Sequence, residues 1–439
     1  MKRVFIFNLK MRMAYNTGLL FHKYLYKHFT NNVTFSYLHK RNLKLVQNFF
    51  HSKPTVILGI ESSCDDTACG IVDTNGQILG EAISSQHLTH LNLGGIIPSV
   101  ARVLHKNSIT KTCENALRAA NLKLKDIDAI ATTVKPGLPM SLRVGTQFGK
   151  YLAQIGKKPF IPIHHMEAHA LTARMNREID FPYLILLVSG AHCLLAVVEN
   201  VNKFYLLGTS INNAPGEMFD KVARRLKLKN IPEFSILNGG LAIETAASKA
   251  SNIEKFLFPP IMTRYRDCNF SFSAFITLCK NYIESEERKH NIVGDAVIPD
   301  AYNLCAALQL ATVTHICHKT QRAMEFINKM SLLPKNKRTL VISGGVACNN
   351  FLAKALNIVS TELGYSFIRT PPKLCTDNGI MIAWNGIEKW ITDVDIIRDP
   401  NEIEKIEIEK VAPLGENWIK KVEEVNLKCK WVKIKKKLF

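Results

Sequence analysis

Two similar series of short strands constrain the fold of this chain more than any other feature. Residues 55–80 are predicted to form three strands joined by turns, and residues 183–207 repeat the same plan. Each series is followed by segments with helical spacing, and this combination is typical of α/β lobes. The predicted fold class is therefore α/β: a duplicated, two-lobed protein with a ligand cleft between the lobes.

This plan predicts four parts along the chain. They are a leader at 1–54, a first lobe at 55–182, a second lobe at 183–395 and a charged C-terminal tail at 396–439. A helix predicted at 379–390 ends the second lobe, and the plan leaves it free to pack back on the first lobe. Residues 298–330 contain few helix breakers and are predicted to form a pair of helices.

The predicted leader is basic throughout. Residues 1–54 contain ten Lys or Arg residues and no acidic residue, and they carry half of the chain's net charge of +20. An acid-free basic segment rich in Phe, Leu and Tyr resembles a mitochondrial targeting sequence, although lysine outnumbers arginine and serine is scarce. We therefore expect mitochondrial localisation. The alternative is a basic tail that binds nucleic acid.

Cysteine usage and hydropathy narrow the class of protein further. The eleven cysteines form no Cys-x-x-Cys pair, which favours free thiols in a reducing compartment over a disulfide framework. The longest apolar stretch, residues 183–198, is interrupted by Ser189-Gly190-Ala191-His192, so we interpret it as two strands and predict no membrane span.

Two histidines form the most specific chemical signal. His165 and His169 are four residues apart, so a helix places both imidazoles on one face, where they can bind one metal ion. In the zinc-protease motif the glutamate follows the first histidine directly, whereas Glu167 lies two places on and faces away. The spacing favours a metal site and argues against such a protease. The alternative is a helix with two histidines on a polar surface.

Asp377 is the natural third ligand. It precedes the helix predicted at 379–390, where an aspartate is more commonly a helix cap. Two histidines and one carboxylate leave coordination positions open, an arrangement that suits Fe(II) and also fits catalytic zinc. We expect one divalent metal ion, with Fe and Zn as the best fits.

Turns rich in small residues indicate a nucleotide between the lobes. Gly344-Gly345 stands between a predicted strand and a predicted helix, where the backbone and the helix N-terminus can approach a phosphate. Residues 189–191 and 64–67 occupy the first turns of the two strand series. The alternatives are a tight connection without ligand at 344–345, plain turn formers at Asp65 and Asp66, and a solvated helical acid at Asp220.

Taken together, these motifs resemble the tRNA N6-adenosine threonylcarbamoyltransferase family, once labelled O-sialoglycoprotein endopeptidases, and in particular its mitochondrial branch. The resemblance runs from about Leu58 to Trp384. The matching segments are Gly59-Ile60-Glu61-Ser62-Ser63-Cys64-Asp65-Asp66-Thr67, His164 through His169, Val188-Ser189-Gly190, Pro215-Gly216-Glu217-Met218-Phe219-Asp220-Lys221, Ser271-Phe272-Ser273, Gly344-Gly345-Val346-Ala347-Cys348-Asn349 and Cys375-Thr376-Asp377-Asn378.

The resemblance implies an actin-like, sugar-kinase-like fold and a set of site residues. Its metal ligands would be His165, His169 and Asp377, and Asp65 would be the acid on which transfer depends. The residues that would contact an adenylate substrate are Leu187, Val188, Ser189, Gly190, Ala191, Asp220, Gly240 and Asn349.

The resemblance also implies a reaction and partners. The family transfers a threonylcarbamoyl group from threonylcarbamoyl-AMP to N6 of adenosine at position 37 of tRNA, releasing AMP; a separate synthase would supply the donor. The oligomeric state stays open, a homodimer included. The rival functions are an ATP-dependent small-molecule kinase, a metallopeptidase and an inactive RNA-binding subunit.

The chain departs from the family pattern in three places. Ala191 stands where the family has glycine, Asn238 replaces a proline, and Ile276 is one of the changes in a motif that commonly carries a lysine. The Ala191 methyl group adds bulk where the backbone would approach a ligand.

Overall fold

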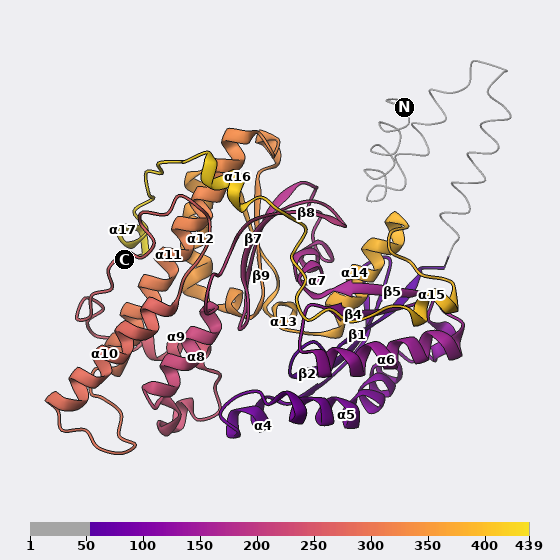
Figure 1. Ribbon diagram of the computed structural model, residues 1–439, viewed down its shortest axis with the longest axis horizontal. Coiled ribbons are helices and arrows are strands. Elements are labelled where there is room, and N and C mark those ends of the chain that lie inside the picture. The colour runs from indigo at the N-terminus through magenta and orange to yellow at the C-terminus, as the bar shows by residue number, and fades with distance from the viewer. Residues whose placement is uncertain (1–52, 439) are drawn as a thin grey trace, which may run out of the picture. The chain divides into compact units, whose positions relative to one another are not determined.

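The computed structural model describes residues 53–438, and it groups residues from Thr55 onward into one compact unit. The predicted leader lies outside the described residues except for its last two positions. All that follows concerns the unit that begins at Thr55 (Figure 1).

The first lobe is built on a five-stranded sheet with the order β3-β2-β1-β4-β5. Its strands are β1 (Val56–Glu61), β2 (Asp66–Asp73), β3 (Ile78–Ser85), β4 (Ala129–Lys135) and β5 (Phe160–His164). The first three strands form an antiparallel meander, and β4 and β5 add in parallel beside β1. Strand β1 is buried along its whole length, as expected for the centre of a covered sheet.

The second lobe repeats this plan on a six-stranded sheet with the order β10-β9-β6-β7-β8-β11. Its strands are β6 (Tyr183–Val188), β7 (Cys193–Asn200), β8 (Lys203–Thr209), β9 (Thr339–Ser343), β10 (Ser366–Arg369) and β11 (Glu416–Asn417). Again an antiparallel meander is followed by parallel strands beside its first member. The prediction of a duplicated α/β fold is confirmed.

Helices cover both sheets (Figure 1). They are α4 (His87–Asn92), α5 (Pro98–Ala119), α6 (Pro139–Gly156), α7 (His165–Leu171), α8 (Pro215–Arg225), α9 (Gly239–Ala247), α10 (Ser273–Lys289), α11 (Ala301–Met330), α12 (Asn350–Glu362), α13 (Pro372–Cys375), α14 (Gly379–Thr392), α15 (Pro400–Glu404), α16 (Ile419–Glu424) and α17 (Lys435–Leu438). The prediction of a pair of helices at 298–330 is wrong. That segment forms the single helix α11, because its interior contains neither Gly nor Pro to break it.

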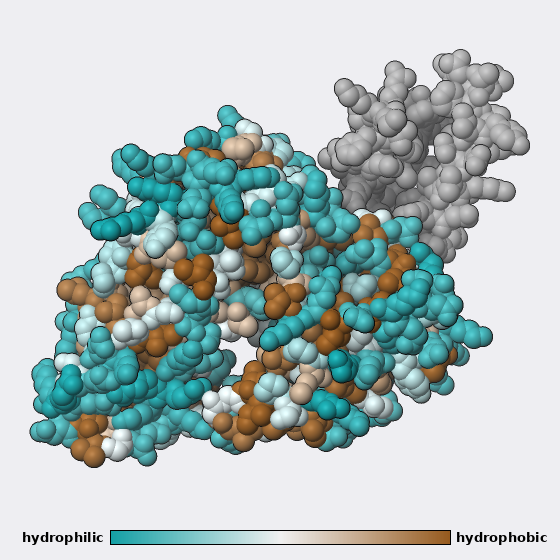
Figure 2. Space-filling model, viewed as in Figure 1, coloured by the Kyte–Doolittle hydropathy of each residue, from teal (hydrophilic) through white to brown (hydrophobic). Residues whose placement is uncertain are grey.

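The layer between the two sheets contains α7 and α14. Buried side chains from both sheets and both helices form one apolar cluster there, including Ile57 of β1, Met166 of α7, Ile185 of β6 and Ile382 of α14. Helices α5 and α6 cover the opposite face of the first sheet. The space-filling view shows a hollow between the α8–α9 side and the α4–α5 side (Figure 2).

Helix α14 packs on the first sheet backbone to backbone. A Cβ atom on Gly59 of β1 would lie 2.3 Å from the Ala383 nitrogen and 2.3 Å from the Gly379 oxygen. A Cβ on Gly70 of β2 would lie 2.4 Å from the Ile380 nitrogen. Only glycine fits at these points, so no side chain separates α14 from β1 and β2 there.

Residues 396–438, which the sequence marks only as charged, contain regular structure. Strand β11 pairs in parallel with β8, and Trp418 stacks on Tyr205 with ring centroids 4.0 Å apart. Val422 of α16 and Ile434 are buried in the core of the second lobe. Among the described residues, no helix is long and apolar enough to span a membrane.

We expect Gly59→Ala to destabilise the protein by about 2 kcal/mol or more, because the added methyl group meets backbone atoms that cannot move independently. Gly345→Ala is the matched control, since its methyl group would contact only the Thr376 methyl group at 4.0 Å. Thermal unfolding of both variants tests the contact. Equal melting temperatures for the two variants would show that α14 does not depend on this close approach.

Candidate functional site

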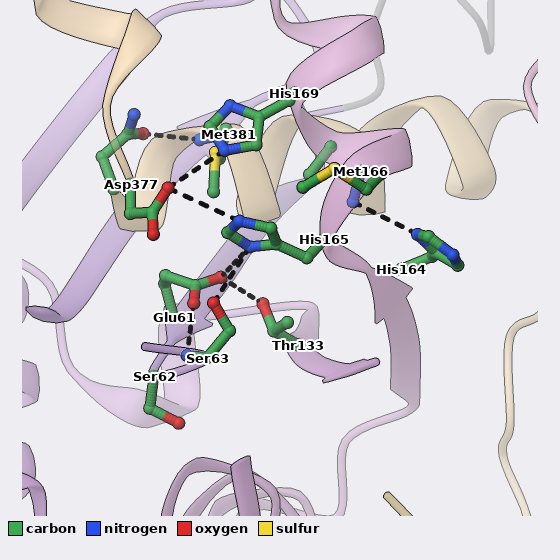
Figure 3. A network of polar contacts seen from close by, with 12 residues as sticks. Glu61, Ser62, Ser63, Thr133, His164, His165, Met166, His169, Asp377 and Met381 are labelled. Carbon is green, nitrogen blue, oxygen red and sulfur yellow. Dashed lines mark hydrogen bonds and ion pairs between the residues drawn. The ribbon is translucent and has the colours of Figure 1, made fainter. Parts of the chain in front are cut away.

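The two histidines lie at the start of α7, which follows β5 without an intervening loop. His164 caps the helix, since its Nδ1 accepts a hydrogen bond from the Met166 nitrogen at 3.2 Å. His165, the next residue, and His169 lie on one face of α7, as their spacing predicts. Both are buried, and their ring centroids lie 4.7 Å apart (Figure 3).

Asp377 approaches both imidazoles from the segment before α14 (Figure 3). Its Oδ1 lies 3.0 Å from His169 Nε2 and 3.5 Å from His165 Nε2. The cap of α14 is the next residue, Asn378, whose Oδ1 accepts from the Met381 nitrogen at 2.8 Å. Asp377 is therefore not the helix cap, and its carboxylate is free to face the histidines.

Glu61, for which the sequence predicts no role, completes the group from the end of β1. It is fully buried, and its Oε2 lies 3.1 Å from His165 Nδ1. Glu61 also accepts hydrogen bonds from the Thr133 hydroxyl and the Ser63 nitrogen, both at 2.5 Å. When the Glu61 carboxylate accepts a hydrogen bond from Nδ1 of His165, the Nε2 atom of that ring is free to bind a metal ion. The available signal was an acidic residue at the end of an otherwise apolar strand.

The charges of this group are coupled. Burial alone would lower the pKa of His165, but the Asp377 and Glu61 carboxylates outweigh burial and raise it to about 10. Burial acts in the opposite direction on the two carboxyls, yet the charge of His165 holds the pKa of each below its usual value. Without metal, the site holds two carboxylates and a protonated His165 at neutral pH.

Glu167 lies outside this group, as its place in the sequence predicts. Its Oε2 is 3.5 Å from the buried Lys389 Nζ, which also contacts Asp395 at 2.8 Å. Burial raises the pKa of Glu167, although the Lys389 charge opposes this effect. Glu167 belongs to an ion-pair network and is not placed to act as a base at the histidines.

Asp65 lies on the turn between β1 and β2, and it is half-buried. Its neighbours feel the charge of Asp377. Burial, followed by the charges of Asp65 and Asp377, raises the pKa of the Cys64 thiol well above its usual value. Burial also raises the pKa of Asp66 to about 6, with a smaller contribution from Asp377. The turn therefore lies within electrostatic range of the histidine group.

The second lobe contributes the turn between β6 and β7. Ser189 Oγ accepts from the His192 nitrogen at 3.1 Å and closes this turn. Gly344, with φ of 98°, packs against the end of β6: a Cβ on Gly344 would lie 2.4 Å from the Val188 oxygen. Gly190 is different, because a Cβ on it would meet no atom within 4 Å. Open space thus borders the backbone at Gly190.

His192 connects this turn with the histidine group. Burial, followed by the charges of His165 and His169, lowers the pKa of His192 to about 4. The turn of the second lobe therefore lies within electrostatic range of the histidine group.

Other predicted adenylate residues differ in what they can offer a ligand. The side chains of Leu187 and Val188 are buried, so only their backbone atoms can reach one. Asn349 caps α12, where its Oδ1 accepts from the Leu352 nitrogen at 2.8 Å. Ala191 is exposed on the turn.

Helix α8 begins against the same turn. The Gly216 nitrogen donates to the Ser189 oxygen at 3.2 Å, and the Glu217 nitrogen donates to the Gly190 oxygen at 3.1 Å. These bonds place α8, which carries Asp220, beside the turn.

Asp220 meets the start of α9. A Cβ on Gly239 would lie 2.4 Å from Asp220 Oδ1, so the helix begins directly against the carboxylate. Asp220 is exposed as a residue, yet burial of its carboxyl raises the pKa of that group, and a hydrogen bond from the Gly239 backbone opposes the effect. Next to it, Gly240 borders open space, with only Asn238 Oδ1 at 3.6 Å from a Cβ.

Comparison with known proteins adds an independent finding. A family model described as tRNA N6-adenosine threonylcarbamoyltransferase matches residues 77–384. The mitochondrial tRNA N6-adenosine threonylcarbamoyltransferase of Rattus norvegicus is 45% identical over 385 residues, covering 88% of this chain and 92% of the rat protein. The corresponding enzyme of Rickettsia canadensis is 40% identical over 336 residues, covering 76% of this chain and 94% of its own.

Among solved structures, one similar chain is component A of the (R)-2-hydroxyglutaryl-CoA dehydratase of Acidaminococcus fermentans. It is 16% identical with a TM-score of 0.44, and the match covers 77% of this chain and 99% of that chain.

We expect divalent metal binding at the histidine group to strengthen as pH rises. The pKa of His165 is raised to about 10 in the metal-free protein, so its imidazole must lose a proton before Nε2 can bind an ion. The Zn²⁺ association constant should therefore rise by up to about tenfold per pH unit around neutrality. Competition with a chelator of known pH dependence measures it. A pH-independent constant would contradict this account of the site.

Proposed function

The chain belongs to the tRNA N6-adenosine threonylcarbamoyltransferase family, and on that premise we propose the reaction it performs. It transfers the threonylcarbamoyl group from threonylcarbamoyl-AMP to N6 of adenosine at position 37 of mitochondrial tRNAs, releasing AMP. The observation that carries the proposal is the convergence of His165, His169 and Asp377 on one point.

His165, His169 and Asp377 would hold one divalent metal ion, Fe or Zn. Their ligand atoms lie within 4.8 Å of one another, and Glu61 supports His165 from behind. Three protein ligands leave at least one position for substrate, as catalytic sites require. When bound, the ion supplies a positive charge that polarises the mixed anhydride of the donor.

The second lobe would hold the adenylate half of the donor. The proposed contacts are Leu187, Val188, Ser189, Gly190, Ala191, Asp220, Gly240 and Asn349. The free space beside Gly190 and Gly240 supports this assignment, because a ligand can approach the backbone there. The Ala191 methyl group is exposed beside that space and narrows the approach to the neighbouring backbone.

Asp65 would act on the tRNA amine. N6 attacks the carbamoyl carbonyl carbon, the bond from that carbon to the phosphate oxygen breaks, and AMP leaves with the electron pair. The amine loses one proton in this exchange, and Asp65 accepts that proton or orients the amine. Its half-buried position on a turn within range of Asp377 supports either role.

tRNA is the proposed polyanionic partner, and a single-stranded anticodon loop is accessible to such a site. Four basic residues at the end of α8 and after it suggest a phosphate-binding surface from the sequence, but two are engaged within the protein. Arg225 and Lys227 both pair with Glu287, at 2.6 Å and 3.2 Å. Lys435 and Lys437 of the terminal cluster also form ion pairs, with Glu254 and Glu362. These residues offer less charge to RNA than the sequence suggests.

The proposed cellular setting is the mitochondrion. The rat and human relatives are named as mitochondrial enzymes, and the basic, acid-free leader is consistent with import. A separate synthase would supply threonylcarbamoyl-AMP.

We expect His169→Ala to lose bound metal and transfer activity together, because it removes one of three ligands. His164→Asn is the matched control: it changes the neighbouring buried histidine but keeps a side-chain oxygen that can cap α7. Metal content by mass spectrometry and transfer to tRNA are measured on both. A His169→Ala protein with a full complement of metal would contradict the ligand assignment.

We expect Asp65→Asn to lower kcat strongly, by about 100-fold or more if Asp65 acts in proton transfer, with little change in melting temperature. Asp73→Asn should instead lower the melting temperature and leave kcat nearly unchanged. Asp73 is a true turn former, whose Oδ1 accepts from the Asn75 and Gln77 nitrogens at 2.9 Å. Steady-state kinetics and thermal unfolding separate the two cases. A large loss of stability in Asp65→Asn would favour a turn-forming role for Asp65.

A further inference from the structure

A buried histidine on α5 holds both sides of the turn that carries Asp65. His105 is fully buried, and its Nε2 lies 3.0 Å from the Cys64 carbonyl oxygen. Its Nδ1 lies 2.7 Å from the Thr67 hydroxyl at the start of β2. One imidazole therefore contacts the residue before Asp65 and the residue that follows Asp66.

The two contacts define the hydrogen positions on the ring. A carbonyl oxygen only accepts, so Nε2 must carry the hydrogen that His105 donates to Cys64. In the neutral ring Nδ1 is then the acceptor, and the Thr67 hydroxyl donates to it. Burial lowers the pKa of His105, although the hydrogen bond to Cys64 and the nearby carboxylates oppose this effect. The neutral ring with its hydrogen on Nε2 satisfies both partners.

The contact with Cys64 bears directly on Asp65. The Cys64 carbonyl and the Asp65 nitrogen belong to one planar peptide unit. A partner that fixes the carbonyl oxygen therefore also fixes the orientation of the Asp65 nitrogen and Cα. Earlier residues of the turn have their own anchors. Ser62 Oγ donates to the Ser141 oxygen at 3.0 Å, and the Leu138 nitrogen donates to the Ser63 oxygen at 2.8 Å. His105 supplies the anchor at Cys64, directly before Asp65.

We propose that His105 is a positioning residue that fixes the peptide between Cys64 and Asp65 and thereby directs the Asp65 carboxylate toward the reacting amine. The inference rests on the proposed role of Asp65 in transfer. His105 itself does not touch substrate. The competing interpretation is that His105 only satisfies buried polar groups and contributes to stability.

Two substitutions of His105 test its contact with Cys64 separately from its contact with Thr67. In His105→Gln the side-chain amide nitrogen is the same number of bonds from Cα as Nε2, so it can still donate to the Cys64 carbonyl. In His105→Asn the amide reaches only as far as Nδ1, so it keeps Thr67 as a partner and loses Cys64. Positioning through Cys64 predicts that the variants differ in kcat, whereas a purely structural role predicts that activity follows stability in both.

We expect His105→Asn to lower kcat by about 10- to 100-fold, with KM for tRNA and metal content unchanged, the range found when residues that orient a catalytic group are removed. His105→Gln should retain kcat to within about threefold. Thr112→Val is the control: Thr112 is buried on the same helix face and donates to the Ser108 oxygen, so its loss lowers stability without affecting the turn. Equal kcat values in the Asn and Gln variants would overturn the proposal.

A double-mutant cycle separates this proposal from the proposed function. If His105 acts through Asp65, adding His105→Asn to Asp65→Asn should cost no further kcat. Full additivity of the two losses would overturn positioning through Asp65. If Asp65→Asn alone keeps full activity, the proposed role of Asp65 fails. If Asp65→Asn is inactive while His105→Asn is fully active, only the positioning proposal fails.

Discussion

The close approach of α14 to the first sheet is the constraint on which the rest of the site depends. At Gly59 and Gly70 no side chain stands between the strands and the helix, so the backbone of α14 contacts the backbones of β1 and β2 directly at these two points. Asp377 precedes this helix by two residues, so the contact of α14 with the sheet also fixes the position of Asp377. The same strand β1 ends in Glu61, so one packing interaction places carboxylates on both sides of His165. Residues far apart in sequence are thereby brought to one point.

Electrostatics explains why this point is suited to an ion. The fully buried Glu61 carboxylate and the partly exposed Asp377 carboxylate lie on two sides of His165, which is costly without a counter-charge, and a protonated His165 supplies one when the site holds no metal. A divalent cation bound between His165, His169 and Asp377 would replace that proton and satisfy the carboxylates more fully. Glu167 does not add its charge to the site, because it is engaged by Lys389. Metal binding and protonation of His165 are thus alternatives at one site.

Local patterns in the sequence predict more of the histidine pair than of its surroundings. The i,i+4 spacing of His165 and His169 follows from helix geometry, so it is readable without a structure. Asp377 required the resemblance to a family, because an aspartate before a helix is usually a cap. Glu61 was missed, since a buried acid is recognisable only when its partner from another element is known. His105 is of the same kind, because its two partners lie on a turn and a strand distant from α5 in sequence. Pairing between distant residues, such as Arg225 with Glu287, is equally invisible in a single sequence.

The identity of the product tests the central claim most directly. The protein would be incubated with threonylcarbamoyl-AMP carrying isotope-labelled threonine and a mitochondrial tRNA transcript, beside a transcript with guanosine in place of adenosine at position 37. Nucleosides and AMP would then be quantified by mass spectrometry. The account predicts labelled N6-threonylcarbamoyladenosine in the first RNA only, with one AMP released for each modified nucleoside. Release of AMP without labelled nucleoside, or equal labelling of both RNAs, would contradict it.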